Sequence, residues 1–300
     1  MSGSTGRPSG RAPRHPIIER VVEKASGARR AGIVGVFDRA AATYDRVGPR
    51  FFAAFGRRLV ARAGLDPGAA VLDVAAGRGA LLFPAAERVG PGGQVIGIDM
   101  APDMVRKTAA EVRSGGWPQV TIREMDAEHL DFADASFDWV LCGFALWFFP
   151  QPGRALGEFF RVLRPGGRVG LSTWAEDCPY VAWLNRELSA SIPLRDPAAP
   201  GRPEPPRFDT PGRLEAAMRQ AGFTGIEIQG EEADFVYPQD EEWWASLWSH
   251  GIRARLERLE PLRLEAVKTE MFIKAGALRR PDGIHTLFRA LFALGTRPQF

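Results

Sequence analysis

The sequence predicts an α/β fold: a Rossmann-like, mostly parallel sheet of seven strands with helices on both faces, a helical insertion before the last strand and an extra N-terminal helix. Two observations support the sheet. Apolar runs alternate with amphipathic helical segments between residues 69 and 174, and glycine- or proline-rich turns separate them. This alternation is typical of βαβ units, in which a helix connects two parallel strands.

Each predicted strand is a short apolar run, and each predicted helix has apolar residues three or four positions apart. We expect the strands at 69–74, 94–98, 119–123, 137–143 and 168–174, and the helices at 79–89, 102–114 and 152–163. The turns Gly90-Pro-Gly-Gly93 and Arg164-Pro-Gly-Gly167 separate elements, because glycine and proline interrupt regular structure.

After residue 174 the alternation stops. The expected elements are a helix at 179–191, a proline-rich loop at 193–208, a helix from Thr210 to Gly222, a strand at Thr224–Tyr237, a helical block at 239–275 and a last strand at about 284–295. The helical block interrupts what would otherwise be an antiparallel hairpin. We therefore interpret residues 239–283 as a helical lid inserted over the active edge of the sheet.

The sheet and its helices form a core of residues 36–238 and 284–300, to which the lid and two N-terminal segments are added. Residues 1–16 are rich in glycine, serine, proline and arginine, and we expect them to be a disordered tail. Apolar residues at helical spacing predict a helical arm at 17–35. The arm packs on its own subunit, covers a pocket or reaches a second subunit, so a homo-oligomer joined through it stays an open alternative.

Charge and composition exclude several classes of protein. The net charge is +3, but residues 1–40 hold eight Lys/Arg against three Asp/Glu, so the basic character belongs to the N-terminal segment. We therefore expect no nucleic-acid partner. No apolar run is long enough to span a membrane, and no signal core begins the chain. Two cysteines, with no histidine at metal-ligand spacing, favour a cytoplasmic protein without a metal site.

Residues 71–79, Val-Leu-Asp-Val-Ala-Ala-Gly-Arg-Gly, are the most informative stretch. A strand, a glycine turn and a helix in this order form a nucleotide-binding corner, because glycine allows close approach of a ligand and the helix start has free N–H groups. A dinucleotide site would need a third glycine where Leu82 stands, and a P-loop would need Gly-Lys-Ser/Thr, which Arg78-Gly79-Ala80 does not supply. Both kinds of nucleotide site are therefore disfavoured.

The order and spacing of the motifs resemble those of class I S-adenosylmethionine-dependent methyltransferases. Within that family, they look most like the small-molecule group that includes the ubiquinone/menaquinone C-methyltransferases. The similarity runs from Val36 to Trp174 and more weakly through 210–235. It includes the motif at 71–79, in which Ala75 stands where the family most often has glycine, and an N-terminal signature at 37–45.

The resemblance implies S-adenosylmethionine as the cofactor. Asp99, at the end of the second strand, is placed to accept the two ribose hydroxyls; the alternative for this residue is a helix N-cap. In the family, the residues at the positions of Asp126 and Ala127 bind the adenine amino group and ring. The cofactor contacts that the resemblance implies are Tyr44, Asp73, Ala75, Gly77, Gly79, Asp99, Met100, Asp126, Ala127, Gly143 and Phe144.

The sulfonium of this cofactor already makes its methyl group electrophilic. The enzyme mainly has to hold the acceptor in line and exclude water. A general base is needed only where the acceptor loses a proton. Tyr180 and His250 are the catalytic candidates; His129, in the adenine-side loop, and His285, at the start of the last strand, are less favoured.

Aromatic residues gather at the predicted strand ends and in the lid. Such residues usually build a core, and we weigh that interpretation equally with a large apolar substrate pocket. The candidate pocket residues are Trp147, Phe148, Trp174, Trp244 and Trp248. A pocket of this kind suits a bulky acceptor, and its aromatic faces could stabilise the carbocation that methylation of an alkene leaves.

We therefore predict an S-adenosylmethionine-dependent methyltransferase of secondary metabolism that acts on a small hydrophobic metabolite, an aromatic or isoprenoid natural product. Direct transfer to carbon is the favoured reaction. Two alternatives stay open: an O- or N-methyltransferase of a more polar small molecule, and a non-catalytic regulatory partner that binds the cofactor.

Overall fold

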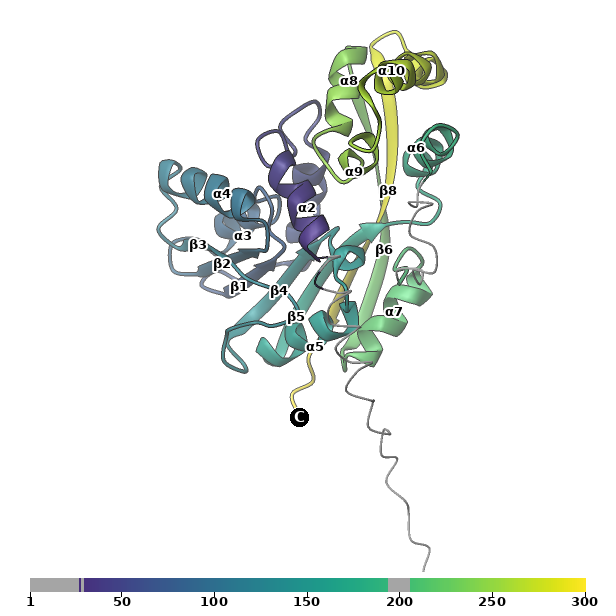
Figure 1. Ribbon diagram of the computed structural model, residues 1–300. Helices are drawn as coiled ribbons and strands as arrows, with labels where there is room; N and C mark the ends of the chain where they lie inside the picture. The colour runs from purple at the N-terminus through teal and green to yellow at the C-terminus, as the bar shows by residue number, and fades with distance from the viewer. Residues whose placement is uncertain (1–26, 28–29, 194–205) are drawn as a thin grey trace, which may run out of the picture.

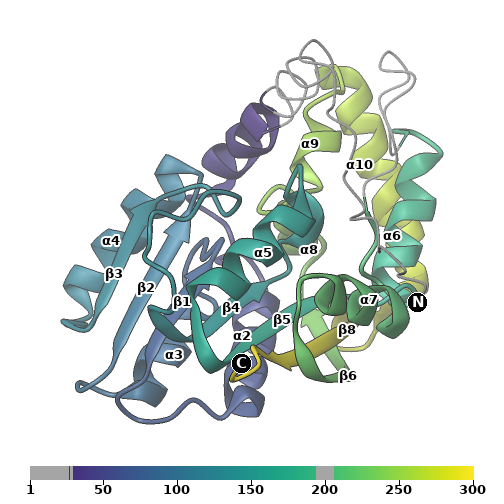
Figure 2. The ribbon, with the colours of Figure 1, turned by 90° about the horizontal axis from the view of Figure 1, so that it is seen from below.

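The structure, a computed structural model, describes residue 27 and residues 30–193 and 206–300 (Figure 1). The tail predicted at 1–16 lies outside the described residues, as do most of the arm predicted at 17–35 and most of the loop predicted at 193–208. The described chain is built around one twisted sheet with helices on both faces (Figures 1 and 2). The predicted α/β class is therefore confirmed.

Eight strands form the sheet of the described residues, in the order β3-β2-β1-β4-β5-β8-β6, with β7 beside β8. Five neighbouring strands are parallel: β1 (Ala70–Val74), β2 (Gln94–Asp99), β3 (Val120–Glu124), β4 (Phe137–Gly143) and β5 (Leu163–Trp174). The antiparallel part contains β6 (Thr224–Tyr237), β7 (Arg279–Arg280) and β8 (Gly283–Thr296). The predicted number of seven is wrong by one, because β7 has only two residues and shows no strand pattern in the sequence.

Helices cover both faces of the sheet and define two apolar cores (Figure 2). The helices on one face are α2 (Phe51–Ala63), α3 (Leu82–Val89) and α4 (Pro102–Ser114). Those on the other face are α5 (Pro152–Val162) and α7 (Pro211–Gln220). Val71 and Leu141 belong to the first core, and their neighbours Leu72 and Val140 belong to the second. Adjacent strand residues thus point to opposite faces, and both faces are covered, so β1 and β4 read as continuous apolar runs.

The helix ends follow from local chemistry. Pro102, Pro152 and Pro211 begin three of these helices, where the fixed φ of proline suits the first turn and its missing N–H is no loss. Thr210 caps α7 by accepting the Arg213 N–H at 3.3 Å. The helix predicted at 79–89 begins three residues later, at Leu82, because the glycine turn continues through the intervening residues.

The helical block predicted at 239–275 lies between β6 and β8 along the chain. It consists of α8 (Asp240–Leu247), α9 (Arg253–Leu256) and α10 (Pro261–Ala275), followed by the short helix η2 (Gly276–Leu278). The two flanking strands are 14 residues long each and extend beyond the parallel strands. The insertion and α6 (Pro179–Ser189) lie at their far end (Figure 1).

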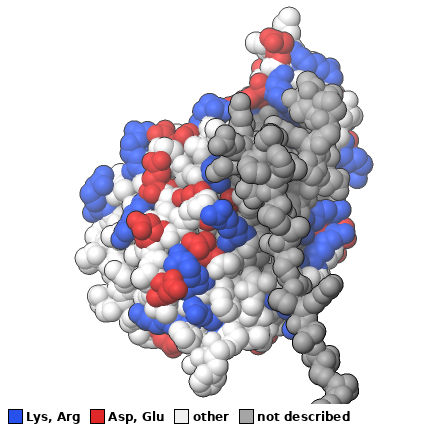
Figure 3. Space-filling view, turned by 60° about the horizontal axis from the view of Figure 1, so that its bottom comes forward, with Lys and Arg blue, Asp and Glu red and all other residues white. Residues whose placement is uncertain are grey.

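The described surface mixes charges of both signs. On the face that Figure 3 shows, Lys/Arg and Asp/Glu side chains are interspersed rather than gathered by sign. Ion pairs among the described residues include those of Arg161 with Asp134 and Glu158, both at 2.8 Å. Within the described ranges, no helix combines the length and the apolar character that crossing a membrane requires.

Candidate functional site

The loop after β1 lies at the carboxyl edge of the sheet, where the strand order reverses between β1 and β4. Open α/β sheets bind their ligands at this position. The loop turns tightly, because Ala75, Gly77 and Gly79 have φ angles of +55°, +52° and +83°. Ala75 thus adopts the left-handed conformation that glycine accepts more easily. The glycine-type turn predicted from the sequence is formed with alanine in it.

Asp99, the last residue of β2, holds this loop in place. Its Oδ2 accepts the Gly77 N–H at 2.8 Å, and its Oδ1 accepts the Ala101 N–H at 2.9 Å. Asp99 is not the N-cap of α4, because that position belongs to Ala101. Burial raises the pKa of Asp99, while the backbone N–H groups act in the opposite direction. Each carboxylate oxygen keeps a second lone pair for a donor from outside the loop.

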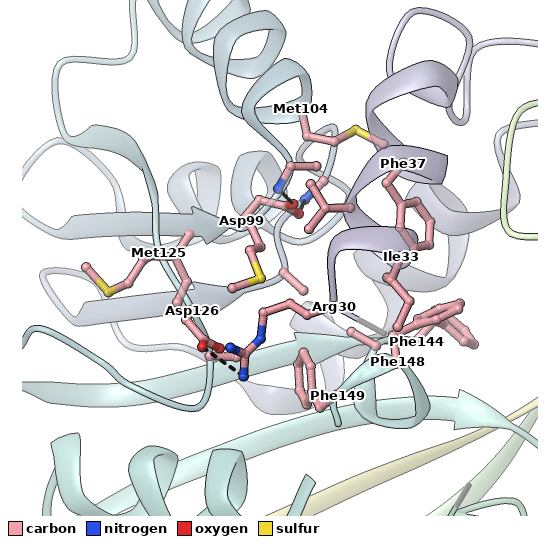
Figure 4. A pocket seen from close by; sticks show the side chains of 18 of the residues that line it. Arg30, Ile33, Phe37, Asp99, Met104, Met125, Asp126, Phe144, Phe148 and Phe149 are labelled. Atoms are coloured by element: carbon pink, nitrogen blue, oxygen red, sulfur yellow. Dashed lines mark hydrogen bonds and ion pairs between the residues drawn. The ribbon is translucent and has the colours of Figure 1, made fainter. Parts of the chain in front are cut away.

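A cleft opens beside the loop (Figure 4). Nine of the predicted cofactor residues line it: Tyr44, Ala75, Gly77, Asp99, Met100, Asp126, Ala127, Gly143 and Phe144. All except Tyr44 come from the carboxyl ends of β1 to β4 or from the segments that follow them. Parallel strands present these ends at one edge, so residues far apart in the sequence converge there.

Asp73 and Gly79, the other two predicted cofactor residues, line two smaller cavities. The cavity at Asp73 shares five lining residues with the cleft, and the cavity at Gly79 shares Tyr44 with it. The Asp73 side chain is buried, and neither of its carboxylate oxygens has a hydrogen-bond partner among the described residues. Burial raises the pKa of Asp73 well above its ordinary value, nearby Asp99 raises it further, and the Leu82 N–H acts in the opposite direction. A buried carboxyl of this kind fits a ligand that brings a positive charge.

Asp126 and Glu128 mark the other end of the cleft. Asp126 Oδ1 accepts the Glu128 N–H at 2.9 Å, and its Oδ2 lies 3.3 Å from Arg30 Nη2 (Figure 4). The Glu128 side chain is 1% exposed and binds the same Arg30 Nη2 at 2.9 Å. Neither Arg30 nor Glu128 was identified from the sequence as a partner of Asp126. Glu128 lies two residues after Asp126 in the sequence, whereas no local pattern pointed to Arg30.

An N-terminal helix over residues 30–40 lies over the cleft. Its residues Ile33, Val34 and Phe37 line the cleft, and the Phe37 ring packs edge-on against Tyr44 and Phe148 with centroids 6.0 and 5.0 Å apart. This helix runs through the boundary that the sequence predicted at residue 35. Residues on both sides of that boundary, Val34 and Phe37, line the cleft.

The predicted substrate residues are only partly brought together. Phe148 lines the cleft, and the Trp174 ring packs against the Phe144 ring, tilted by 33° with centroids 4.1 Å apart. Trp244 packs against Phe272 inside the insertion instead. Trp248 lies under Arg253 of α9, and Trp147 packs near Phe148. None of Trp147, Trp244 and Trp248 lines the cleft.

Trp174 belongs to a group of packed rings that we call the aromatic cluster: Phe51, Phe52, Phe55, Phe144, Trp174 and Phe288. Phe144 links this cluster to the cleft, since it belongs to both. The cluster extends from the end of β4 toward β8 and the insertion. It therefore continues the apolar wall of the cleft away from Asp99 and Asp126.

The two catalytic candidates differ in their surroundings. The Tyr180 hydroxyl accepts a hydrogen bond from Trp243 Nε1 at 2.8 Å, and burial raises the pKa of Tyr180 well above its ordinary value. The His250 ring packs edge-on against Phe51 with centroids 5.8 Å apart, and burial lowers the pKa of His250 to about 4. His250 is therefore neutral at pH 7, and it adjoins the aromatic cluster.

His250 makes stability depend on pH. Its folded pKa of about 4 lies below the ordinary 6.5, so on acidification the unfolded chain binds a proton there before the folded protein does. Stability is therefore lost as pH falls from about 6.5 toward 4, by about 2 kcal/mol between pH 7 and pH 5. We expect His250→Phe to remove this part of the pH dependence, measured by urea unfolding at both pH values. Equal pH dependence in the two proteins would contradict the burial of this ring.

The fold and the cleft are those of the Rossmann-like class of nucleoside-cofactor proteins. Comparison with known proteins narrows this class. Residues 71–167 match the family model described as "Methyltransferase domain". The chain is 38% identical over 246 residues to nocamycin O-methyltransferase of Saccharothrix syringae, covering 79% of this chain and 88% of that protein. The chain therefore belongs to the class I S-adenosylmethionine-dependent methyltransferases, and the resemblance seen in the sequence is confirmed.

Two further comparisons agree with this assignment. Aklanonic acid methyltransferase DauC of Streptomyces sp. strain C5 is 40% identical over 161 residues, covering 54% of this chain and 73% of that one. The YcgJ protein of Bacillus subtilis has a similar fold, with a TM-score of 0.56 and 19% identity over 82% of this chain and 100% of that one. At this identity the second likeness shows the fold alone.

Proposed function

We propose that this methyltransferase acts on a small hydrophobic metabolite, an aromatic or isoprenoid natural product, with S-adenosylmethionine bound in the cleft. The observation that carries the proposal is the position of Phe144, which lines the cleft and also packs against Trp174 of the aromatic cluster. An acceptor beside the methionine end would therefore meet aromatic faces. Relatives named for nocamycin and aklanonic acid support a natural-product acceptor.

The residues of the cleft fit this cofactor, which when bound supplies a methyl group on a positively charged sulfur. We assign Asp99 to the ribose hydroxyls and Asp126 to the adenine amino group, because both carboxylates reach the cleft at strand ends. We assign Asp73 to the positively charged methionine end, since its oxygens have no partner among the described residues. Tyr44 and Phe37 lie against the cleft and would exclude water.

We favour oxygen as the methylated atom, whereas the sequence favoured carbon. His250 is neutral at pH 7, and no hydrogen bond to its ring is present among the described residues. A pKa near 4 makes the ring a weak base, so we assign it to orient an acceptor hydroxyl by accepting its hydrogen bond. The hydroxyl proton passes to solvent as the methyl group bonds to the oxygen and leaves the sulfur. We assign no proton transfer to Tyr180, because Trp243 already holds its hydroxyl. The relative named as an O-methyltransferase supports this choice.

Two measurements test the proposal. Calorimetry with S-adenosylhomocysteine, beside NAD as a control ligand, is expected to show binding of the first alone. Transfer of labelled methyl from S-adenosylmethionine to a panel of polyketide phenols, enols, carboxylic acids and prenylated quinones then identifies the acceptor class, and NMR of the product identifies the atom. Absence of S-adenosylhomocysteine binding would refute the cofactor site. Binding without transfer to any acceptor would favour the regulatory alternative, and a C-methylated product would overturn the choice of oxygen.

A further inference from the structure

We infer that Arg30 and Glu128 form a latch that holds the N-terminal helix over the adenine end of the cleft. The inference rests on the proposed cofactor site and adds a positioning residue to it. Arg30, Ile33, Val34 and Phe37 all line the cleft. Their spacing places them on one face of the helix, three or four residues apart. Arg30 is the charged residue of that face and lies nearest to Asp126 (Figure 4).

Glu128 is the fixed part of the latch. Its side chain is buried, and its Oε1 accepts the Gln151 N–H at 2.6 Å while its Oε2 binds Arg30 Nη2 at 2.9 Å. A buried carboxylate without a nearby cation is strongly unfavourable. Arg30 is the cation that the structure places beside it, so release of the helix would leave Glu128 uncompensated. This requirement ties the position of the helix to the loop after β3.

Asp126 is the residue at which the cofactor can replace a contact of Arg30. Its Oδ1 is occupied by the Glu128 N–H, and its Oδ2 faces His129 Nδ1 at 3.1 Å and Arg30 Nη2 at 3.3 Å. The contact with Arg30 is the longer of the two and has no hydrogen-bond geometry. An adenine amino group can therefore replace Arg30 at Asp126 while Arg30 keeps its shorter bond to Glu128. The helix stays closed when the adenine enters.

A second observation points to the same ligand. The Nε–H of Arg30 is buried and has no hydrogen-bond partner among the described residues. A buried donor without a partner is costly, so it marks a place where a bound molecule can supply an acceptor. The ring nitrogens of a purine are acceptors of this kind. Arg30 would thus bind both Glu128 and the cofactor, which makes closure of the helix part of adenine recognition.

The test is a double-mutant cycle on the affinity of the full chain for S-adenosylhomocysteine, measured by calorimetry. Arg30→Met and the double variant are expected to weaken binding equally, roughly tenfold, because both lose the latch and the Nε–H contact with the purine. Glu128→Gln loses the latch alone and is expected to weaken binding less. Independent roles would instead make the loss in the double variant the product of the two single losses. Arg30→Met alone leaves the buried Glu128 carboxylate without a cation, which destabilises the fold. The double variant removes both charges together, so we expect it to stay folded even if Arg30→Met does not.

Arg39→Met is the matched control, because Arg39 belongs to the same helix but pairs with Glu257 of the insertion. The Arg39 side chain is half exposed. We therefore expect the Arg39→Met protein to bind S-adenosylhomocysteine with an affinity within about twofold of wild type. Unchanged or tighter binding by Arg30→Met would overturn the latch, as would an equal loss in the control. If the wild-type chain itself fails to bind S-adenosylhomocysteine, the proposed cofactor site fails instead.

Discussion

Replacing Asp99 with Asn is expected to weaken binding of S-adenosylhomocysteine by about 100-fold, because two charge-assisted hydrogen bonds to the ribose are lost or weakened. The two carboxylate oxygens already accept the N–H groups of Gly77 and Ala101. An amide has one acceptor oxygen, so its NH₂ would face one of these N–H groups, donor against donor. The glycine loop would then lose its attachment to β2 as well. Calorimetry on the purified variant measures the effect.

Asp103→Asn is the matched control for this experiment. Asp103 lies four residues further on, in the first turn of α4, and its carboxylate pairs with Arg106 on the surface. An exposed pair of this kind contributes little to stability or binding. We expect the affinity of this variant to equal that of wild type. An Asp99→Asn protein with wild-type affinity would show that the ribose lies elsewhere and would refute the assignment of the cleft.

Replacing Gly56 with Ala is expected to destabilise the protein by at least about 3 kcal/mol, through overpacking against rigid backbone. Gly56 is a buried residue of α2, and a Cβ there would lie 2.1 Å from the Ala80 carbonyl oxygen. Relief requires α2 to move away from the loop that follows Gly79. This movement would also shift Phe51 and Phe52, so weaker cofactor binding should accompany the loss of stability. Urea unfolding measures the first effect and calorimetry the second.

Gly157→Ala offers a control with the opposite sign. Gly157 lies in the exposed middle of α5, and no atom lies within 4 Å of the position its Cβ would take. Alanine favours a helix over glycine, so this variant should gain about 1 kcal/mol. The same substitution is thus expected to act in opposite directions at the two sites. Wild-type stability of Gly56→Ala would contradict the close contact between α2 and the glycine loop.

Much of the fold could be predicted from the sequence, because the parallel strands are buried on both faces and read as apolar runs between glycine turns. The strand predicted at Thr224–Tyr237 matches β6, and the one at 94–98 matches β2 to within one residue. The prediction failed where local pattern is weak. Two residues at Arg279–Arg280 are too few for a period, and α3 begins late because Gly79 still has a left-handed φ.

The placement of side chains outside the motifs could not be predicted. Trp174, Trp244 and Trp248 are the same type of residue, yet of these three only Trp174 packs against a residue of the cleft wall. Trp244 packs against Phe272 and Trp248 against Arg253, both within the insertion. Tyr180 follows the fifth strand closely, but α6 turns its hydroxyl toward Trp243. Aromatic residues carry no local signal that separates a core from a pocket, so the sequence left these alternatives equal.

The sequence by itself determined the class of fold, the family and the residues at the carboxyl ends of the strands. It could do so because strand, turn and helix are local patterns, and because parallel strands bring Ala75, Asp99 and Asp126 to one edge whatever lies between them. Only the tertiary structure decided which remote residues close the cleft. Arg30 meets Glu128 across 98 positions of the chain, and such a meeting depends on packing rather than on any pattern in the sequence.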